Sequence, residues 1–340
     1  MASTLPPSLS FLVVGDWGNE ADVTDMRGVA RAMNEWASEH KSNAVISLGD
    51  NFYKGGSYDY EGVLSKDDKK FTSLWSDVFN GPALRALPWW ITMGNHDWYG
   101  QGSSGHQLDF KHENWHFPDL FYSKRVPLGF SDMYASFIFI ETDLLQYGYG
   151  ALAKNDSQMA GNFETFGWVE AAQTVEKQLA WLDKALETAN QDALVFVVGH
   201  HGGFACSFDV VQAVYMDRVV ALINKWNVSS YIHGHHHTMA YYYTNNGATL
   251  HVQAGSGGNV DAACAPIDTT AKGEELPNTY GFVHLSISGR DGAVFEFVTE
   301  IGEVVFEAKV GLRAPVEGVF ADTTHLPDAE DPAVHYKKSA

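Results

Sequence analysis

Five short segments of this 340-residue chain combine glycine with side chains that bind metal ions. Their carboxylate, phenol and imidazole groups are ligands for iron, zinc or manganese, and an asparagine amide adds a weaker oxygen donor. The segments are Gly15-Asp16-Trp17-Gly18, Gly49-Asp50-Asn51-Phe52-Tyr53, Gly94-Asn95-His96-Asp97, Val197-Val198-Gly199-His200 and Gly234-His235-His236-His237. A chance origin for the whole set is improbable, although each motif alone is typical of an ordinary turn.

This donor set suits two hard or borderline cations. The chain has only two cysteines, so it offers no thiolate cluster. Two ions ~3.5–4 Å apart can clamp a phosphate, neutralise its charge and supply a hydroxide nucleophile. The residues therefore predict metal-assisted chemistry on a phosphate ester.

Each of the five segments follows or ends a short apolar run that reads as a buried strand. Ligands at the carboxyl ends of strands in one α/β sheet converge, however far apart they are in sequence. Glycine beside each ligand allows a sharp turn and a close approach of the backbone. The buried strands expected in the first two thirds of the chain are Ser10–Val14, Ala44–Leu48, Trp89–Met93, Ser136–Glu141, Ala193–Val198 and Val228–Ile232.

Amphipathic helices separate these strands, and strands dominate the rest of the chain. Helices are expected at 25–39, 168–188 and 210–226, and later strands at 249–253, 282–288, 293–299 and 304–310. The pattern indicates an α/β (α+β) fold in which two packed mixed β-sheets are flanked by helices. We expect an N-terminal segment over 1–10, a catalytic domain over 11–312 and a C-terminal extension or tail over 313–340.

The histidine run has an informative alternation. In an extended segment, His235 and His237 share one face and His236 points the other way. Asp97 follows His96, and either orients its imidazole or is a solvated turn residue. His106, His112 and His116 lie near Glu113, and we interpret them as part of a polar loop in preference to a further metal site.

The net charge of −20 argues against binding to nucleic acid or to anionic membranes. It also means that a phosphate site needs concentrated local positive charge, which metal ions supply. No apolar run approaches the ~20 residues that span a bilayer. Residues 1–10 show no secretory signal, so the chain is either intracellular or has lost one.

The five segments, in this order, resemble the calcineurin-like metallophosphoesterases. The tyrosine three residues after Asp50 narrows the resemblance to the purple acid phosphatases, in particular the small, mammalian-type tartrate-resistant acid phosphatases. The similarity extends from about Phe11 to about Leu312. It implies a four-layer sandwich and a secreted, vacuolar or lysosomal location.

Carried over to this chain, the resemblance implies a ferric ion and a second divalent metal, Fe²⁺, Zn²⁺ or Mn²⁺. The ferric ion would be held by Asp16, Asp50, Tyr53 and His237, with Asp50 bridging. The second ion would be completed by Asn95, His200 and His235. His96 would lie just outside the metals and approach the phosphate ester.

The chain departs from the family pattern in two places. His201 and Gly202, just after the ligand His200, stand where small family members often show an aromatic residue and a proline, and the other departure is Asp209. Asp209 stands where the family commonly has a histidine, and it either points away, works as a protonated acid, or caps the following helix. His201 then becomes a candidate catalytic residue that supplies the missing imidazole.

Two further features leave alternatives open. Residues 147–166 form a lid, a recognition loop or, as we prefer, a plain surface loop. Cys206 and Cys264 either form one disulfide or stay as thiols.

Together the residues and the resemblance predict a binuclear acid phosphatase that hydrolyses phosphate monoesters by attack of a metal-bound hydroxide, with His96 assisting the leaving group. The substrates would be small phosphate monoesters or phosphorylated proteins, and we expect a monomer. A phosphodiesterase on the same fold and a non-catalytic metal-binding protein are the alternatives.

Overall fold

A computed structural model describes residues 9–129, 132–147, 157–166, 171–202, 215–244, 249–263 and 272–318. Asp209, Cys206 and Cys264 lie outside these ranges, so the predictions made for them stay predictions. Within the ranges, no helix has both the length and the apolar character that crossing a bilayer requires.

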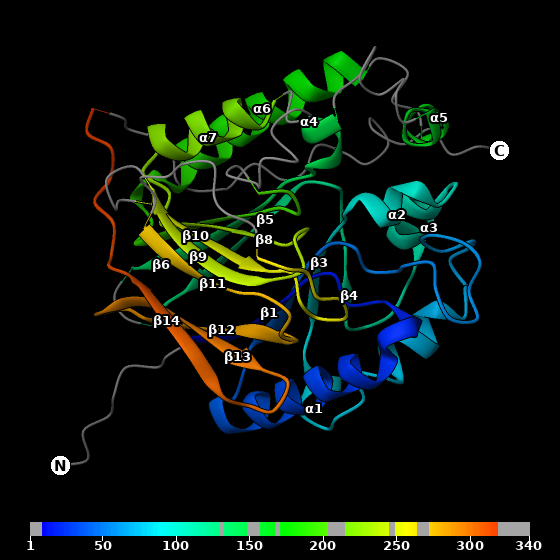
Figure 1. Cartoon of the computed structure of the whole chain (residues 1–340). Helices are drawn as coiled ribbons and strands as arrows, with labels where there is room; N and C mark the ends of the chain where they lie inside the picture. The colour runs from blue at the N-terminus through cyan, green and yellow to red at the C-terminus, as the bar shows by residue number, and fades with distance from the viewer. Residues whose placement is uncertain are drawn as a thin grey trace.

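Two mixed sheets of seven strands each form the centre of the molecule (Figure 1). The first sheet has the order β14-β13-β12-β1-β2-β3-β4, and its strands are β1 (Leu9–Val14), β2 (Ala44–Leu48), β3 (Trp89–Thr92), β4 (Trp115–His116), β12 (Gly281–Ser288), β13 (Gly292–Thr299) and β14 (Val304–Val310). The second has the order β11-β9-β10-β8-β7-β6-β5, and its strands are β5 (Tyr122–Pro127), β6 (Tyr134–Phe139), β7 (Leu194–Val198), β8 (Ser230–His233), β9 (Met239–Thr244), β10 (Thr249–Ala254) and β11 (Lys272–Leu276).

Helices cover the outer faces of both sheets. Figure 1 shows α1 below the first sheet and α6 and α7 above the second. The helices are α1 (Val23–His40), α2 (Asn95–Tyr99), α3 (Ser103–Asp109), α4 (Asp143–Tyr147), α5 (Ser157–Phe166), α6 (Ala171–Thr188) and α7 (Met216–Lys225). Short helical turns occupy Glu20–Asp22, Phe71–Ser76, Leu84–Ala86 and Ala189–Gln191. The predicted sandwich of two mixed sheets flanked by helices is confirmed.

Aromatic side chains fill the space between the sheets. The ring of Phe11 on β1 lies 5.0 Å from that of Phe137 on β6, and Phe137 also lies 5.5 Å from Trp90 on β3. Each of these side chains is at most 8% exposed. Their burial holds the two sheets face to face, so the strand ends that carry the ligands are fixed relative to one another.

The expected strands all correspond to observed ones, within a few residues at their ends. The predicted loop over 147–166 is in part wrong, because Ser157–Phe166 form helix α5. The strands β4, β5, β9 and β11 were not expected. Edge strand β11, with the sequence Lys-Gly-Glu-Glu-Leu, has the charged residues and glycine that strand patterns seldom contain.

Candidate metal centre

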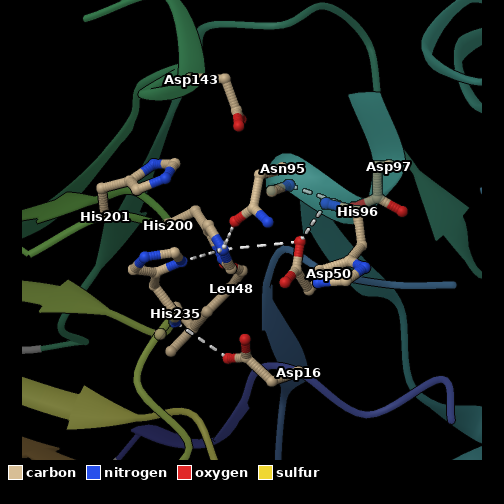
Figure 2. Close-up of polar contacts among 12 residues, drawn as sticks. Asp16, Leu48, Asp50, Asn95, His96, Asp97, Asp143, His200, His201 and His235 are labelled. Carbon is tan, nitrogen blue, oxygen red and sulfur yellow. Dashed lines mark hydrogen bonds and ion pairs between the residues drawn. The ribbon is translucent and has the colours of Figure 1, made fainter. Parts of the chain in front are cut away.

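The predicted ligands meet where strand ends of both sheets come together. Asp16, Asp50 and Asn95 follow β1, β2 and β3, which are parallel neighbours in the first sheet. His200 and His235 follow β7 and β8, which are parallel neighbours in the second. Figure 2 shows these five side chains directed toward a common space.

Three of the predicted ligands adopt a left-handed backbone conformation that residues other than glycine rarely take. The φ angles of Asp16, Asp50 and His235 are +59°, +50° and +73°. Such strain persists only where the surrounding structure enforces it, and it concentrates at functional sites. The expected extended conformation at 235–237 is therefore wrong, although His235 and His237 both reach the site.

One group of ligands surrounds the phenol oxygen of Tyr53. This atom lies 2.8 Å from Asp50 Oδ2, 3.1 Å from Asp16 Oδ1 and 3.2 Å from His237 Nε2. All these side chains are buried except His237, which is partly exposed. Four donor atoms of the types that bind a hard cation thus face one another.

A second group surrounds Nε2 of His200. This atom lies 3.2 Å from Asn95 Oδ1, 3.3 Å from His235 Nδ1 and 3.5 Å from Asp50 Oδ1. The carbonyl of Leu48 accepts a hydrogen bond from His200 Nδ1 at 2.8 Å, which leaves Nε2 as the nitrogen available to an ion. The two oxygens of Asp50 therefore face different groups, so this one carboxylate can contact both candidate ion sites.

The charges and the space in the site fit two cations. Burial raises the pKa of Asp16 to about 6, and the neighbouring Asp50 carboxylate acts in the same direction. Burial also opposes ionisation of Asp50, but the positive charges of His200 and His96 hold its pKa well below the ordinary value. At Gly94, a Cβ atom would lie 2.4 Å from Asp50 Oδ1 and 2.6 Å from His200 Nε2, so only glycine keeps the second group accessible to an ion.

Residues 9–239 match the calcineurin-like phosphoesterase family. The chain belongs to this family.

Relatives of this phosphoesterase are acid phosphatases. It is 27% identical over 324 residues to rabbit (Oryctolagus cuniculus) tartrate-resistant acid phosphatase type 5, covering 91% of this chain and 92% of the rabbit protein. It is 25% identical to the Homo sapiens protein of the same name, and the match covers 92% of this chain and 94% of the human protein. Purple acid phosphatase 7 of Arabidopsis thaliana is 26% identical, and the match covers 74% of this chain and 70% of the plant protein.

Solved structures share the fold of this phosphoesterase. GAP50 of Plasmodium, described as the anchor in the inner membrane complex, superposes with a TM-score of 0.71 at 21% identity, covering 91% of this chain and 90% of that one. Purple acid phosphatase PPD1 from yellow lupin superposes with a TM-score of 0.58 at 17% identity, and the match covers 88% of this chain and 53% of the lupin chain.

His96, the predicted catalytic residue, lies beside the first group of ligands. Its ring is centred 4.2 Å from that of Tyr53, and its backbone N–H donates to Asp50 Oδ1 at 2.8 Å. Its Nδ1 lies 3.0 Å from Glu61 Oε2. Burial opposes protonation of His96, but the Asp50 and Glu61 carboxylates raise its pKa above the ordinary value.

Asp97 plays neither of the roles expected from the sequence. It is completely buried, and its carboxylate accepts hydrogen bonds from the backbone N–H groups of Asn51, Phe52 and Gly94. The Gln107 amide donates to it at 2.8 Å. Asp97 thus ties the loop after β2 to the loop after β3, and Glu61 contacts the His96 ring in its place.

Asp261 contacts the predicted ligand His237, and no sequence motif predicted this contact. Its Oδ2 lies 3.1 Å from Nδ1 of His237, so Nε2 of that ring faces Tyr53 and Asp16. A carboxylate in this position orients the imidazole and makes it a better ligand. Asp261 follows β10 in a loop without regular structure, and a contact 24 residues back in sequence leaves no local pattern.

His201, the second predicted catalytic residue, is buried next to His200 and His235. One ligand atom from each of the three lies within 4.8 Å of the other two. The backbone N–H groups of His200 and His201 donate to Thr142 Oγ1, so the proton of this hydroxyl goes to His201 Nδ1 at 2.9 Å. Nδ1 is then an acceptor, so the single N–H proton of the neutral His201 ring is on Nε2, which suits hydrogen-bond donation better than metal binding.

Asp143, at the start of α4, was not predicted as a site residue. Its side chain is completely buried and receives no hydrogen bond from an N–H or hydroxyl group of the described residues. Figure 2 shows it pointing toward Asn95 and the space beside His201. Burial and the nearby Glu141 carboxylate raise the pKa of Asp143 well above the ordinary value.

The predicted polar loop around His112 contains no comparable group of ligand atoms among the described residues.

Proposed function

We propose that this chain is a binuclear acid phosphatase that hydrolyses phosphate monoesters. The observation that carries the proposal is the pair of ligand groups that share Asp50, with a tyrosine in the first group. The names of the relatives, which are acid phosphatases, support hydrolysis of phosphate esters.

In this proposal, Asp16, Tyr53 and His237 would hold a ferric ion, and Asn95, His200 and His235 would hold a divalent Fe²⁺, Zn²⁺ or Mn²⁺ ion. Asp50 would be shared by the two sites. When bound, the ions would neutralise the phosphate oxygens and provide the nucleophile by lowering the pKa of water. The purple colour of such a centre would come from the Tyr53 phenolate on iron.

His96 and His201 then act on the substrate. His96 lies on the Tyr53 side of the centre, where its Nε2 can give a proton to the departing alkoxide. His201 presents an Nε2–H group on the His235 side, where it can donate to a phosphate oxygen. His96 follows strand β3 of the first sheet and His201 follows strand β7 of the second, so the two imidazoles flank the predicted metal ligands from opposite sides.

The proposed substrates are small phosphate monoesters or phosphorylated proteins, and the proposed state is a monomer. The net charge of −20 disfavours nucleic acid and anionic membranes as partners. Plasmodium GAP50 is described as an anchor, so the shared fold alone does not carry the catalytic proposal. The ligand set and His96 carry it, against the alternative of a non-catalytic metal-binding protein.

The test combines metal analysis, a visible spectrum and two substrates. We expect two metal ions per chain, with at least one iron, and a visible absorption band that Tyr53→Phe abolishes without loss of fold. We also expect p-nitrophenyl phosphate to be hydrolysed faster than bis(p-nitrophenyl) phosphate. Preference for the diester would favour the phosphodiesterase, and a colourless wild type with full iron content would refute the role of Tyr53.

A further inference from the structure

The ring of His96 is held by a carboxylate that lies outside the five motifs. Oε2 of Glu61 lies 3.0 Å from His96 Nδ1 and also accepts the backbone N–H of Lys54 at 2.9 Å. Both side chains are about three-quarters buried, with 23% of Glu61 and 28% of His96 exposed. The contact is therefore shielded from bulk water and spans 35 residues of sequence.

The chemistry of this contact fixes which nitrogen of His96 carries a proton. The backbone N–H of Lys54 donates to the same oxygen, Oε2, as expected of an ionised carboxylate. An ionised carboxylate only accepts hydrogen bonds, so Nδ1 of His96 must be the donor. Nε2 is then the nitrogen left to exchange a proton with a substrate.

We propose that Glu61 is the positioning residue of His96: by accepting the Nδ1 proton, it fixes the ring orientation and directs Nε2 to the ester oxygen. This inference rests on the proposed function. Glu61 touches neither the reacting atoms nor the metal ligands named above. Its effect on hydrolysis passes entirely through the His96 ring.

The segment that carries Glu61 is built to hold it still. The ammonium group of Lys70 is completely buried and donates to the carbonyls of Tyr60 and Gly62, the two neighbours of Glu61, at 2.8 Å each. It donates to the carbonyl of Tyr53 at 2.9 Å. Lys70 therefore links the backbone of the ligand Tyr53 to the backbone on both sides of Glu61.

A purely structural role for Glu61 is the competing explanation, because it also binds the Lys54 N–H group. Only the positioning role makes the loss of activity depend on the leaving group and on the presence of the His96 ring. The glutamine side chain retains an acceptor oxygen for Nδ1, whereas Glu61→Ala removes it. Asp59→Asn is the matched control, since Asp59 is an exposed carboxylate of the same loop.

The kinetic test uses the metal-loaded enzyme with a good leaving group, in p-nitrophenyl phosphate, and a poor one, in glycerol phosphate. We expect Glu61→Ala to lower kcat for glycerol phosphate on the order of 10- to 100-fold, as when the partner that orients a histidine is lost. KM and metal content should change little, and the loss should be smaller for p-nitrophenyl phosphate. Glu61→Gln should recover most of the activity, and Asp59→Asn should match the wild type.

A double-mutant cycle decides whether Glu61 acts through His96. We expect Glu61→Ala to have no further effect on kcat in the His96→Ala background. Additive losses would overturn the proposal, as would an equal loss for both substrates or a Glu61→Gln variant as poor as Glu61→Ala.

A second readout needs no turnover. In the diamagnetic zinc-loaded protein with ¹⁵N-labelled histidine, the His96 signals should show a proton on Nδ1, and Glu61→Ala should remove this preference. A wild-type His96 without a proton on Nδ1 overturns the proposal. A wild type that hydrolyses no phosphate monoester but shows the Nδ1 proton would refute the proposed function and leave the Glu61–His96 pairing in place.

Discussion

At the scale of single residues, the site depends on Asp50 more than on any other ligand described above. One of its oxygens lies in the Tyr53 group and the other in the His200 group, and the same oxygen that faces His200 accepts the backbone N–H of His96. Its backbone is held at a φ of +50° to make this possible. Among the described residues, no other predicted ligand joins both groups and His96, the predicted catalytic histidine.

Asp50→Asn should therefore lose more metal than a change in a ligand of one group. Asparagine keeps the shape of the side chain but removes the charge that two cations share. We expect Asp50→Asn to lose both ions, and His235→Ala to lose chiefly the divalent one. Metal content per folded chain, measured after gel filtration, checks this. Equal metal content in the two variants would contradict bridging.

Residues of two kinds differ in how well the sequence predicted them. Asp16, Asp50, His200 and His235 each come two residues after a buried strand, so a local pattern of strand, glycine and ligand identifies them. Glu61 and Asp261 lie in loops, and their partners are 35 and 24 residues away. No local pattern encodes such contacts, because the loop conformation depends on tertiary packing. The role of Asp97 was predicted wrongly for the same reason, because most of its hydrogen-bond partners lie in the loop after β2.

At the scale of elements, loops as well as strand ends position the site, and the loop after β2 depends on one buried cation. Lys70 is fully buried, burial lowers its pKa to about 8, and its ammonium group serves three carbonyls. Its charge also lies 4.2 Å from the centre of the Tyr60 ring. The loop has little regular structure of its own, so Lys70 takes the place of a strand partner.

Lys70→Met should destabilise the protein strongly, since methionine has a similar length but leaves three carbonyls without a donor. We expect a loss on the order of 3 kcal/mol or more in the free energy of unfolding. Urea denaturation of both proteins measures it. Lys69→Met, at an exposed neighbour, is the control and should lie within ~0.5 kcal/mol of the wild type. A loss for Lys70→Met as small as for Lys69→Met would show that the carbonyls find other donors.

At the scale of the whole molecule, the candidate metal centre lies where strand ends of the two sheets meet. Asp16, Asp50 and Asn95 follow strands of the first sheet, and His200, His235 and His237 follow β8 or β7 of the second. Bound ions would therefore add their binding free energy to the contact between the sheets. In their absence, the buried carboxylates of Asp16 and Asp143 oppose that contact.

Removal of the metals should thus lower the melting temperature more at neutral than at acidic pH. The raised pKa of Asp16, about 6 against an ordinary 3.8, means that the metal-free folded state binds more protons than the unfolded state. The stability that this protonation gives is complete below the ordinary pKa and is lost as pH rises through about 6. The pKa of Asp143 is shifted in the same direction.

Thermal melts of the chelated and metal-loaded proteins at pH 5 and pH 7 provide the measurement. We expect the difference in melting temperature to grow with pH, and Asp143→Asn to reduce this growth. A difference that is independent of pH would mean that the buried carboxylates are neutralised in some other way.

The strand order carries a consequence for how the protein is made. Strand β1 lies between β2 and β12, so the strand that leads to Asp16 is completed by residues 281–288, near the end of the described chain. The ligands themselves are spread from residue 16 to residue 237. During synthesis, neither the full set of ligands nor the finished sheet exists until most of the chain has left the ribosome. We therefore expect the proposed metal loading to be a late event, because the last ligand, His237, follows about two thirds of the chain.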